Sequence, residues 1–358
     1  MFTSQFLLAE KRLDDNTDLT QFLIQSGFLF QEASGFYSFQ HLGQLALDRL
    51  EHKLKKALDT MGLAQWSLSL LQAETLWEAT QRAQDYGDEL MSVQLRNGAK
   101  MRLSATAEEQ ITNIMQKRLQ GRAVQQWMYQ IGTKWRDEIR ARGGLLRGRE
   151  FRMMDAYHFV ESEEKMLQTH QKGRDGLVQF LQRLGCIVRT VEADCGEVGG
   201  QMSEEIQVAT SLDESGWLEV GHCFALGQKY SKAFNFKSRN NDYVWMGCQG
   251  LGTSRLLAVL LEARRDHWKL MGDDQYSVVD HVIVKLGKQE QTQQKALALY
   301  EKLKQQGGVV IFEDRSLSAG QALSASETLC AKERWVVSDR LGDHIEHTQL
   351  STQKTEIL

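Results

Sequence analysis

The chain has 358 residues, of which 42% are apolar and 25% charged, and its formal net charge is -4. This composition is typical of a folded globular protein, and the length predicts two or three domains. The small negative charge excludes a chain whose nucleic-acid affinity rests on overall basicity, although it leaves room for a local basic surface. No apolar run reaches the ~18 residues of a membrane span, and the N-terminal stretch turns acidic too early for a secretory signal peptide. The five cysteines stand singly, which predicts reduced thiols in a cytoplasmic protein rather than disulfides or a zinc site.

Proline is absent from the sequence. Average usage would give roughly 18 prolines in this length, and the chance of none at random is on the order of one in a hundred million. The 29 glycines show that turn-forming residues are not depleted in general. The composition therefore indicates selection or deliberate design against this one amino acid.

The first strong periodicity predicts an amphipathic helix over residues 42–61. Leu47, Leu50, Leu54 and Leu58 recur at three- and four-residue spacing opposite a charged face, and Gly62 supplies a stop signal. A short apolar run then predicts a strand over 66–71.

The middle of the chain alternates extended and helical patterns. Two extended runs flank a stretch rich in glycine and arginine, which predicts a long β-hairpin. Until about residue 265 we expect an antiparallel sheet with helices packed on it, an α+β fold. The expected hairpin strands are 128–140 and 149–159, the further strands 217–226 and 243–248, and the helices 177–184 (ending at Gly185) and 253–264.

The pattern changes after the charged, turn-prone stretch 264–277. Strands over 281–286, 309–313 and 334–337 with a helix over 292–304 predict a small parallel or mixed α/β domain. We therefore expect domains at 1–270 and 277–358, and a loose polar tail after His347.

Four short motifs are candidates for chemistry. Each is weak alone, because an Arg-x-Glu pair on a strand is usually a solvated cross-strand pair and a G-x-G-x-x-R run can be a tight turn with a surface arginine. Their order and spacing together carry the information. They are Thr106-Ala107-Glu108-Glu109, Arg136-Asp137-Glu138, Arg147-Gly148-Arg149-Glu150-Phe151 and Gly250-Leu251-Gly252-Thr253-Ser254-Arg255.

Together these motifs resemble the class II aminoacyl-tRNA synthetases, specifically the bacterial-type prolyl-tRNA synthetases. The resemblance covers nearly the whole chain. It implies a class II catalytic domain with a C-terminal anticodon-binding domain, a homodimer, and ATP-dependent activation of L-proline followed by transfer to tRNA(Pro). It is strongest over residues 129–140, 149–159, 193–200, 220–231 and 246–252.

The chemistry of adenylate formation suits the nucleotide motifs. The amino-acid carboxylate attacks the α-phosphate, so the protein must position two anions and neutralise charge at phosphorus, a task that fits guanidinium groups. The resemblance implies that Arg136 bridges carboxylate and α-phosphate, and that Arg136 and Arg255 are the catalytic residues. It further implies Glu138 at the adenine amino group, Arg147 at the γ-phosphate, Phe151 and Arg255 on the two adenine faces, and Gly252 beside the nucleotide. Triphosphate chemistry generally requires Mg²⁺ on the phosphates. Glu219 is the candidate ligand, and an exposed strand carboxylate is an equally good interpretation of this residue.

The resemblance also implies an amino-acid pocket. Thr106 and Glu108 match the loop that holds the secondary ammonium of proline, which a hydroxyl and a carboxylate suit. Arg136 holds the substrate carboxylate. The candidate pocket walls are Met153, Tyr157 and Phe224, although such residues are more often ordinary core. His222 lies in a family-like run near the pocket, where a single histidine is more often structural.

The sequence departs from the family pattern at several positions, most of which are prolines in the family. Ser69, Ala73, Asp88 and Ala141 stand where the family carries proline, Ala107 replaces a histidine, and Glu204 stands where histidine is frequent. The interval 210–216 is too short for the editing domain that bacterial relatives insert there.

Three functional classes fit the sequence. The first is a proline–tRNA ligase, used as a backup or resistance enzyme because a proline-free protein can be translated without charged tRNA(Pro). A designed proline-free sequence is the competing explanation of that composition. The second class is an adenylating paralogue that activates proline or an analogue for a non-tRNA acceptor, and the third is a non-catalytic regulator. The intact nucleotide set argues against the third, and the tRNA-reading domain argues against the second.

Overall fold

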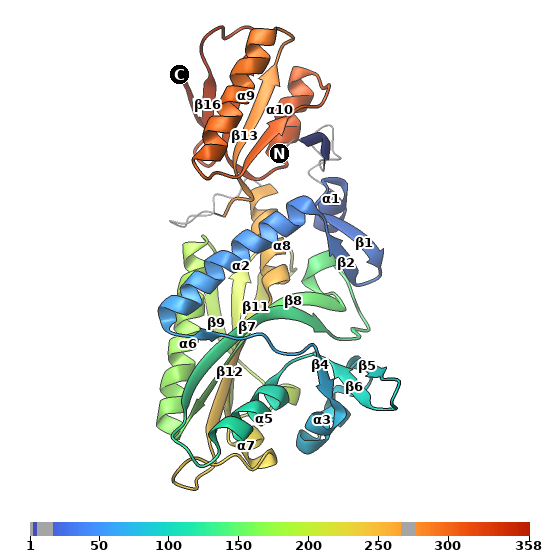
Figure 1. Ribbon diagram of the computed structural model, residues 1–358, viewed down its shortest axis with the longest axis vertical. Helices are drawn as coiled ribbons and strands as arrows, with labels where there is room; N and C mark the ends of the chain where they lie inside the picture. The colour runs from blue at the N-terminus through green and yellow to red at the C-terminus, as the bar shows by residue number, and fades with distance from the viewer. Residues whose placement is uncertain (1–2, 6–16, 266–275) are drawn as a thin grey trace.

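A computed structural model describes residues 3–5, 17–265 and 276–358 of the chain. A large body built on one sheet carries a smaller α/β body at one end (Figure 1). The large sheet has seven strands, and every neighbouring pair is antiparallel except β3 with β7. The expected α+β fold is confirmed. In spatial order the strands are β3 (Ala64–Gln65), β7 (Gln125–Trp135), β8 (Glu150–Val160), β12 (Trp245–Leu251), β11 (Trp217–Gly227), β10 (Met202–Ala209) and β9 (Val188–Ala193).

Three long helices pack on this sheet: α2 (His41–Met61), α6 (Glu163–Arg183) and α8 (Thr253–Arg265). The predicted stripe of α2 is buried, with Leu50 and Leu54 fully so. Gly62 ends the helix in the left-handed conformation at φ 90°, as the stop signal predicts. The prediction of α6 is too short, because Gly173 interrupts the helical signal. A Cβ at Gly173 would lie 2.8 Å from the Gln249 side chain, so glycine allows the close approach of α6 to the sheet.

The long hairpin is confirmed. Strands β7 and β8 pair without a break from Gln125 opposite Val160 to Trp135 opposite Glu150. The arginine-rich connection contains one 3-10 turn, η3 (Gly144–Leu146). The strand-to-helix passage into α8 also begins at Thr253 as predicted.

The predicted strand over 66–71 is wrong. Trp66 N–H still bonds to the Tyr129 carbonyl at 2.7 Å, but the Leu68 N–H goes to the Gln130 side chain at 3.3 Å. The backbone ladder therefore ends there. Leu71 opens a separate three-stranded sheet, in the order β4 (Leu71–Ala73), β6 (Lys100–Leu103) and β5 (Ser92–Gln94).

The remaining elements of this body are short pieces around the sheet. They are α1 (Leu19–Gln25), β1 (Leu29–Ala33), β2 (Phe36–Phe39), α3 (Glu74–Thr80), α4 (Arg82–Tyr86), η2 (Gly87–Glu89), α5 (Glu108–Leu119), η4 (Gly196–Val198) and α7 (Lys229–Ala233). The short turn η1 (Thr3–Gln5) instead lies against the smaller body, where Thr3 bonds to Glu313 and Ser4 to Asp314. The interval 210–216 is a tight turn between β10 and β11.

The C-terminal body has a mixed five-stranded sheet, with parallel pairing at β13 and antiparallel pairing beyond β15. The expected loose tail is wrong, because residues after Glu346 form a hairpin in which the Thr348 and Thr355 hydroxyls meet at 3.0 Å. In order the strands are β14 (Val310–Glu313), β13 (Val279–Leu286), β15 (Ala331–Ser338), β16 (Glu346–Gln349) and β17 (Lys354–Ile357), with helices α9 (Glu290–Gln305) and α10 (Ala319–Glu327).

Helix α2 holds the start of this C-terminal body. Arg49 forms a 2.6 Å ion pair with Asp280, and the Tyr276 hydroxyl donates to the Ala46 carbonyl at 2.6 Å. Most of the turn-prone stretch 264–277 lies outside the described residues. Within the described ranges, no helix is both long and apolar enough to cross a membrane.

Candidate active site

A cavity of about 360 Å³ opens over the large sheet. Phe151 and Met153 of β8 line it, whereas Met154 belongs to the core packed beneath α2 and α8. The cavity therefore lies on the opposite face of the strand from those helices. Nine predicted site residues meet around it, from the β7–β8 hairpin, from β11 and from the β12–α8 junction: Arg136, Glu138, Arg147, Phe151, Met153, Glu219, His222, Gly252 and Arg255.

Two arginines are anchored by backbone carbonyls. Arg136 donates from Nε and Nη2 to the Ala105 carbonyl at 3.4 and 3.3 Å, and its guanidinium lies 5.4 Å from the centre of the Phe151 ring. Arg255 donates to the carbonyls of Leu146 and Glu219, both at 2.8 Å. Burial lowers the pKa of Arg255, partly offset by Glu219, and the charges of Arg136 and Arg147 add to the lowering. An anion placed among these guanidinium groups would relieve their repulsion.

The third arginine pairs with Glu138. Arg147 Nε lies 2.8 Å from a Glu138 carboxylate oxygen, and the Arg140 N–H donates to the other oxygen at 3.0 Å. Burial alone would raise the pKa of Glu138, but these hydrogen bonds and the nearby arginine charges hold it below its usual value. The carboxylate is therefore an ionised acceptor at the mouth of the cavity.

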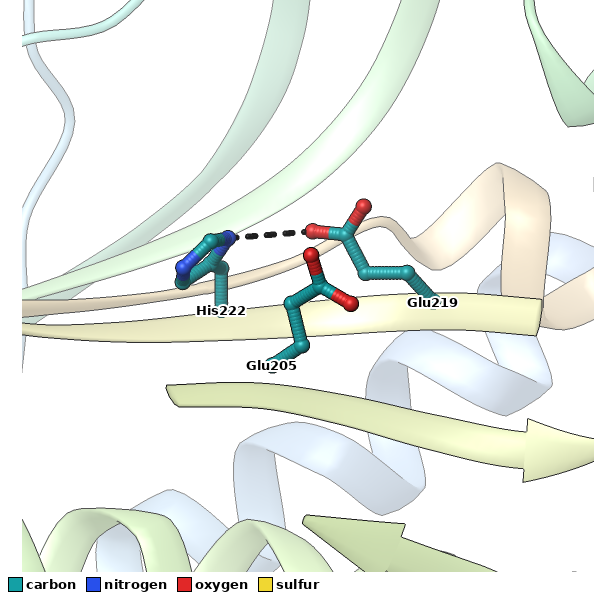
Figure 2. A group of neighbouring side chains, drawn as sticks. All are labelled: Glu205, Glu219 and His222. Carbon is teal, nitrogen blue, oxygen red and sulfur yellow. Dashed lines mark hydrogen bonds and ion pairs between the residues drawn. The ribbon is translucent and has the colours of Figure 1, made fainter. Parts of the chain in front are cut away.

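A β-bulge gathers the acidic groups of the site. Between Ile206 and Gln207 the β10–β11 register shifts, so that Gly221 pairs with Ile206 but Glu219 with Gln207. Because of this extra residue, Glu219 and His222 lie on one face although they are three positions apart. Figure 2 shows both side chains together with Glu205, which lies opposite His222 in the register.

The Glu205, Glu219 and His222 side chains form a compact polar group. One ligand atom from each lies within 4.8 Å of the others, and His222 Nδ1 is 3.2 Å from Glu219. Burial would raise the pKa of Glu219, but His222 and the Arg255 charge keep it below its usual value. Glu219 and His222 line the cavity, and Glu205 adds a second carboxylate beside them.

The Thr106–Glu108 loop lies one layer behind the cavity lining. Thr106 and Glu108 are buried and hydrogen-bonded to each other. Arg136 connects this loop to the cavity through the Ala105 carbonyl. Tyr157 is core, with its hydroxyl accepting from the Ala107 N–H at 3.2 Å, and Phe224 stacks on His222 at 4.1 Å between ring centres. The assignment of these four residues to an amino-acid pocket stays a prediction.

Two polar residues of the site were not among the sequence candidates. Glu205 is brought in by the strand register, and Arg82 reaches Glu108 from α4, at 3.3 Å. Sequence carried a weak signal only for Glu205, through its position in an alternating strand pattern. The β-bulge that brings Glu219 to the same face as Glu205 and His222 has no signature in the sequence.

Residues 92–264 match the family described as tRNA synthetase class II core domain (G, H, P, S and T). The chain folds over 99% of its length like a prolyl-tRNA synthetase of Giardia lamblia solved with prolyl-adenylate, covering 76% of that chain with a TM-score of 0.82 at 18% identity. The fold and the matched core define a class II aminoacyl-tRNA synthetase.

Two relatives identify the family within this class. The chain is 30% identical over 300 residues to the proline–tRNA ligase of Anaplasma phagocytophilum (strain HZ), covering 69% of this chain and 70% of that protein. It is 26% identical over 406 residues to the proline–tRNA ligase of Ehrlichia ruminantium (strain Gardel), covering 98% and 95%. The chain belongs to the prolyl-tRNA synthetase family, so it is an enzyme of the aminoacyl-tRNA synthetase class.

Proposed function

We propose that this chain activates L-proline with ATP and transfers it to tRNA(Pro). The observation that carries the proposal is the convergence of Arg136, Arg147 and Arg255 on one cavity over the sheet. Three guanidinium groups suit a triphosphate and a carboxylate, because they are permanently charged and bind oxyanions in a bidentate way.

Each residue then has a role in positioning. Arg136 has an Nη1 group with no protein acceptor in the described part of the chain, and this group would bind the substrate carboxylate and the α-phosphate. Arg147 is the most exposed of the three arginines and would leave Glu138 for the γ-phosphate, freeing Glu138 for the adenine amino group. Phe151 and Arg255 would enclose the base, and Gly252 leaves room for it.

Mg²⁺ fits the acidic group of Figure 2. It prefers oxygen ligands and keeps several waters, so Glu219 and Glu205 would hold it while His222 orients Glu219. When bound, the ion supplies charge neutralisation on the phosphates. We expect Glu219→Gln to raise the Mg²⁺ concentration needed for half-maximal exchange by about tenfold, whereas Glu192→Gln, exposed on the edge strand β9, should leave it unchanged.

The direct test of activation is ATP–pyrophosphate exchange with single amino acids. We expect proline to support exchange in the absence of tRNA. Exchange with another amino acid but not with proline would refute the assigned substrate, and exchange without transfer to tRNA would favour the adenylating paralogue.

The tRNA and dimer assignments rest on the family. The C-terminal α/β body would bind the anticodon, and the turn at 210–216 leaves no room for an editing domain. A second copy of the chain would cover the apolar side chains that the β4–β6–β5 sheet and its approach expose, namely Leu70, Val93 and Leu95. Light scattering at micromolar concentration should give the mass of a dimer, and Val93→Lys should shift it toward a monomer.

The missing prolines support a backup or resistance role. A proline-free enzyme can be translated when charged tRNA(Pro) is scarce. Ala73, a family proline position, has φ -64°, within the range a proline ring imposes, so the chain keeps this conformation without proline. Ala73 also lies on an edge strand, β4. The Ser104 N–H bonds to the Leu70 carbonyl, and alternate residues of an antiparallel strand form such bonds, so the Ala73 N–H points away from β6. A proline, which lacks this N–H, would therefore remove no bond between the strands.

That geometry supplies a matched control. Ala73→Pro should fold and exchange normally, but its messenger contains one proline codon. In cells whose resident synthetase is blocked, we expect the natural chain to accumulate and restore charged tRNA(Pro), and Ala73→Pro to accumulate more slowly. Equal accumulation of the two, or accumulation without charged tRNA, would refute the backup role.

A further inference from the structure

A fully buried arginine lies behind the Thr106–Glu108 loop. Arg82 opens α4, and its side chain has 0% exposure. Its Nη1 donates to both carboxylate oxygens of Glu109 at 2.9 and 3.1 Å, and to Glu108 Oε2 at 3.3 Å. One guanidinium therefore links the two adjacent carboxylates of this loop.

Aromatic rings enclose the guanidinium on its other sides. Its central carbon lies 5.5 Å from the Trp77 ring centre, 5.3 Å from Tyr86 and 5.6 Å from Tyr230. Nη2 contacts the Tyr86 hydroxyl at 3.4 Å, and Nε has no hydrogen-bond partner among the described residues. Water cannot share this charge, so the two carboxylates and the ring faces alone compensate its burial.

The charges of the three residues do not cancel. Two carboxylates face one guanidinium, which leaves one negative charge when both are ionised. Burial would raise the pKa of Glu108, but Arg82 and the Thr106 hydroxyl hold it below its usual value. Burial and the Glu108 charge raise the pKa of Glu109, despite Arg82. Glu108 is therefore the more acidic of the two carboxylates. Because Arg82 bonds to both oxygens of Glu109 but to one oxygen of Glu108, the excess negative charge lies at Glu108 and matches that of one ammonium group.

We propose that Arg82 and Glu109 are positioning residues, which fix the orientation and the negative charge of Glu108 for the ammonium group of the amino acid. This inference rests on the proposed function, in which Glu108 binds that group. Arg82 touches neither substrate nor cavity and acts through Glu108. The polar groups that face Glu108 from the surrounding elements are Thr106, Glu109, Arg82, Tyr86, Lys134, Tyr157, Lys229, Tyr230 and Cys248.

Substitutions at Arg82 separate charge from structure. In Arg82→Met two buried carboxylates are left side by side, so Glu108 takes up a proton more readily. We expect the KM for proline to rise about ten- to a hundredfold at pH 7 and to fall again toward pH 8.5 as Glu108 ionises. The natural chain should show no such fall beyond the titration of proline itself. Arg82→Lys keeps the charge but loses the forked, ring-stacked geometry, so its KM for proline should lie between those of the natural chain and Arg82→Met.

Glu109→Gln provides a second variant that keeps Arg82 in place. It removes the excess negative charge, so the KM for proline should rise without a new pH dependence. In the double variant Arg82→Met with Glu109→Gln, one carboxylate remains and Glu108 ionises again. The double variant should therefore bind proline more tightly than Arg82→Met, a reversal that accumulated structural damage does not produce.

The measurement is proline-dependent ATP–pyrophosphate exchange from pH 6 to 8.5, with the KM for ATP and proline binding by calorimetry determined beside it. A selective, pH-dependent rise in the KM for proline and rescue by Glu109→Gln confirm the inference. Equal changes in both KM values, or an unchanged and flat KM for proline in a folded Arg82→Met, overturn it. A natural chain that neither binds proline nor supports exchange overturns the proposed function, and this inference with it.

Discussion

Replacing Arg136 by alanine removes the guanidinium placed between the two reacting anions. Among the described residues, the guanidinium makes two long hydrogen bonds to one carbonyl and a ring contact with Phe151. The cost in folding stability should therefore be small, about 1 kcal/mol. In the transition state the same group would neutralise charge developing on phosphorus, and loss of such a preorganised donor costs about 3–4 kcal/mol, or a hundred- to thousandfold in rate.

The assay is proline-dependent pyrophosphate exchange at saturating ATP, with thermal unfolding of the same preparations. The control is Arg340→Ala, an exposed arginine in the turn after β15 of the C-terminal body and not part of the cavity lining. We expect exchange to fall a hundredfold or more in Arg136→Ala and to stay unchanged in the control. A folded Arg136→Ala with exchange within threefold of the natural chain would refute this role for the arginine.

Three further predictions address specificity and stability. A pocket for pyrrolidine rejects smaller residues by only ~1–3 kcal/mol per methylene, so we expect mischarging with alanine or cysteine in the absence of a separate deacylase; rapid hydrolysis of supplied Ala-tRNA by the pure protein would contradict this. Burial would raise the pKa of Glu204, but His170 and Arg174 hold it below its usual value. The ionised Glu204 therefore stabilises the folded protein above its unfolded-state pKa, and this stabilisation is lost as pH falls through the folded-state pKa. Glu204→Gln should lower the free energy of unfolding at pH 7, measured with urea, and should weaken its dependence on pH in the acid range. A Cβ at Gly43 would lie 2.2 Å from the Phe28 carbonyl oxygen, whereas one at Gly320 meets nothing within 4 Å. Gly43→Ala should therefore destabilise the protein, and Gly320→Ala should stabilise it by up to ~1 kcal/mol.

Local sequence patterns predicted one element on each face of the sheet, namely helix α2 behind it and the hairpin that lines the cavity. The leucine stripe of α2 and the arginine-rich turn between β7 and β8 are signals contained within single segments, and both elements are present. The tail at Glu346–Ile357 was missed because its strands are almost wholly polar. They form by backbone pairing with the edge of β15 and with each other, which polar composition does not reveal.

The candidate site likewise contains residues predicted from local motifs and residues whose positions depend on the packing of the fold. Arg136 and Arg255 were found from motifs that keep their spacing along the chain. Glu205 required the bulge in the β10–β11 register, and Arg82 required the packing of α4 against α5 and α7. A single sequence contains neither the register shift nor that packing, so the residues that support Glu219 and Glu108 emerge only from the fold.

The most direct measurement is aminoacylation of tRNA(Pro) with radiolabelled L-proline, run beside pyrophosphate exchange on the same enzyme. Arg136→Ala and a tRNA of another specificity serve as the two controls. We expect the natural chain to form prolyl-tRNA(Pro) in the presence of ATP and Mg²⁺, and neither control to do so. Proline-dependent exchange with no prolyl-tRNA formed, or no reaction with proline in either assay, would contradict a proline–tRNA ligase.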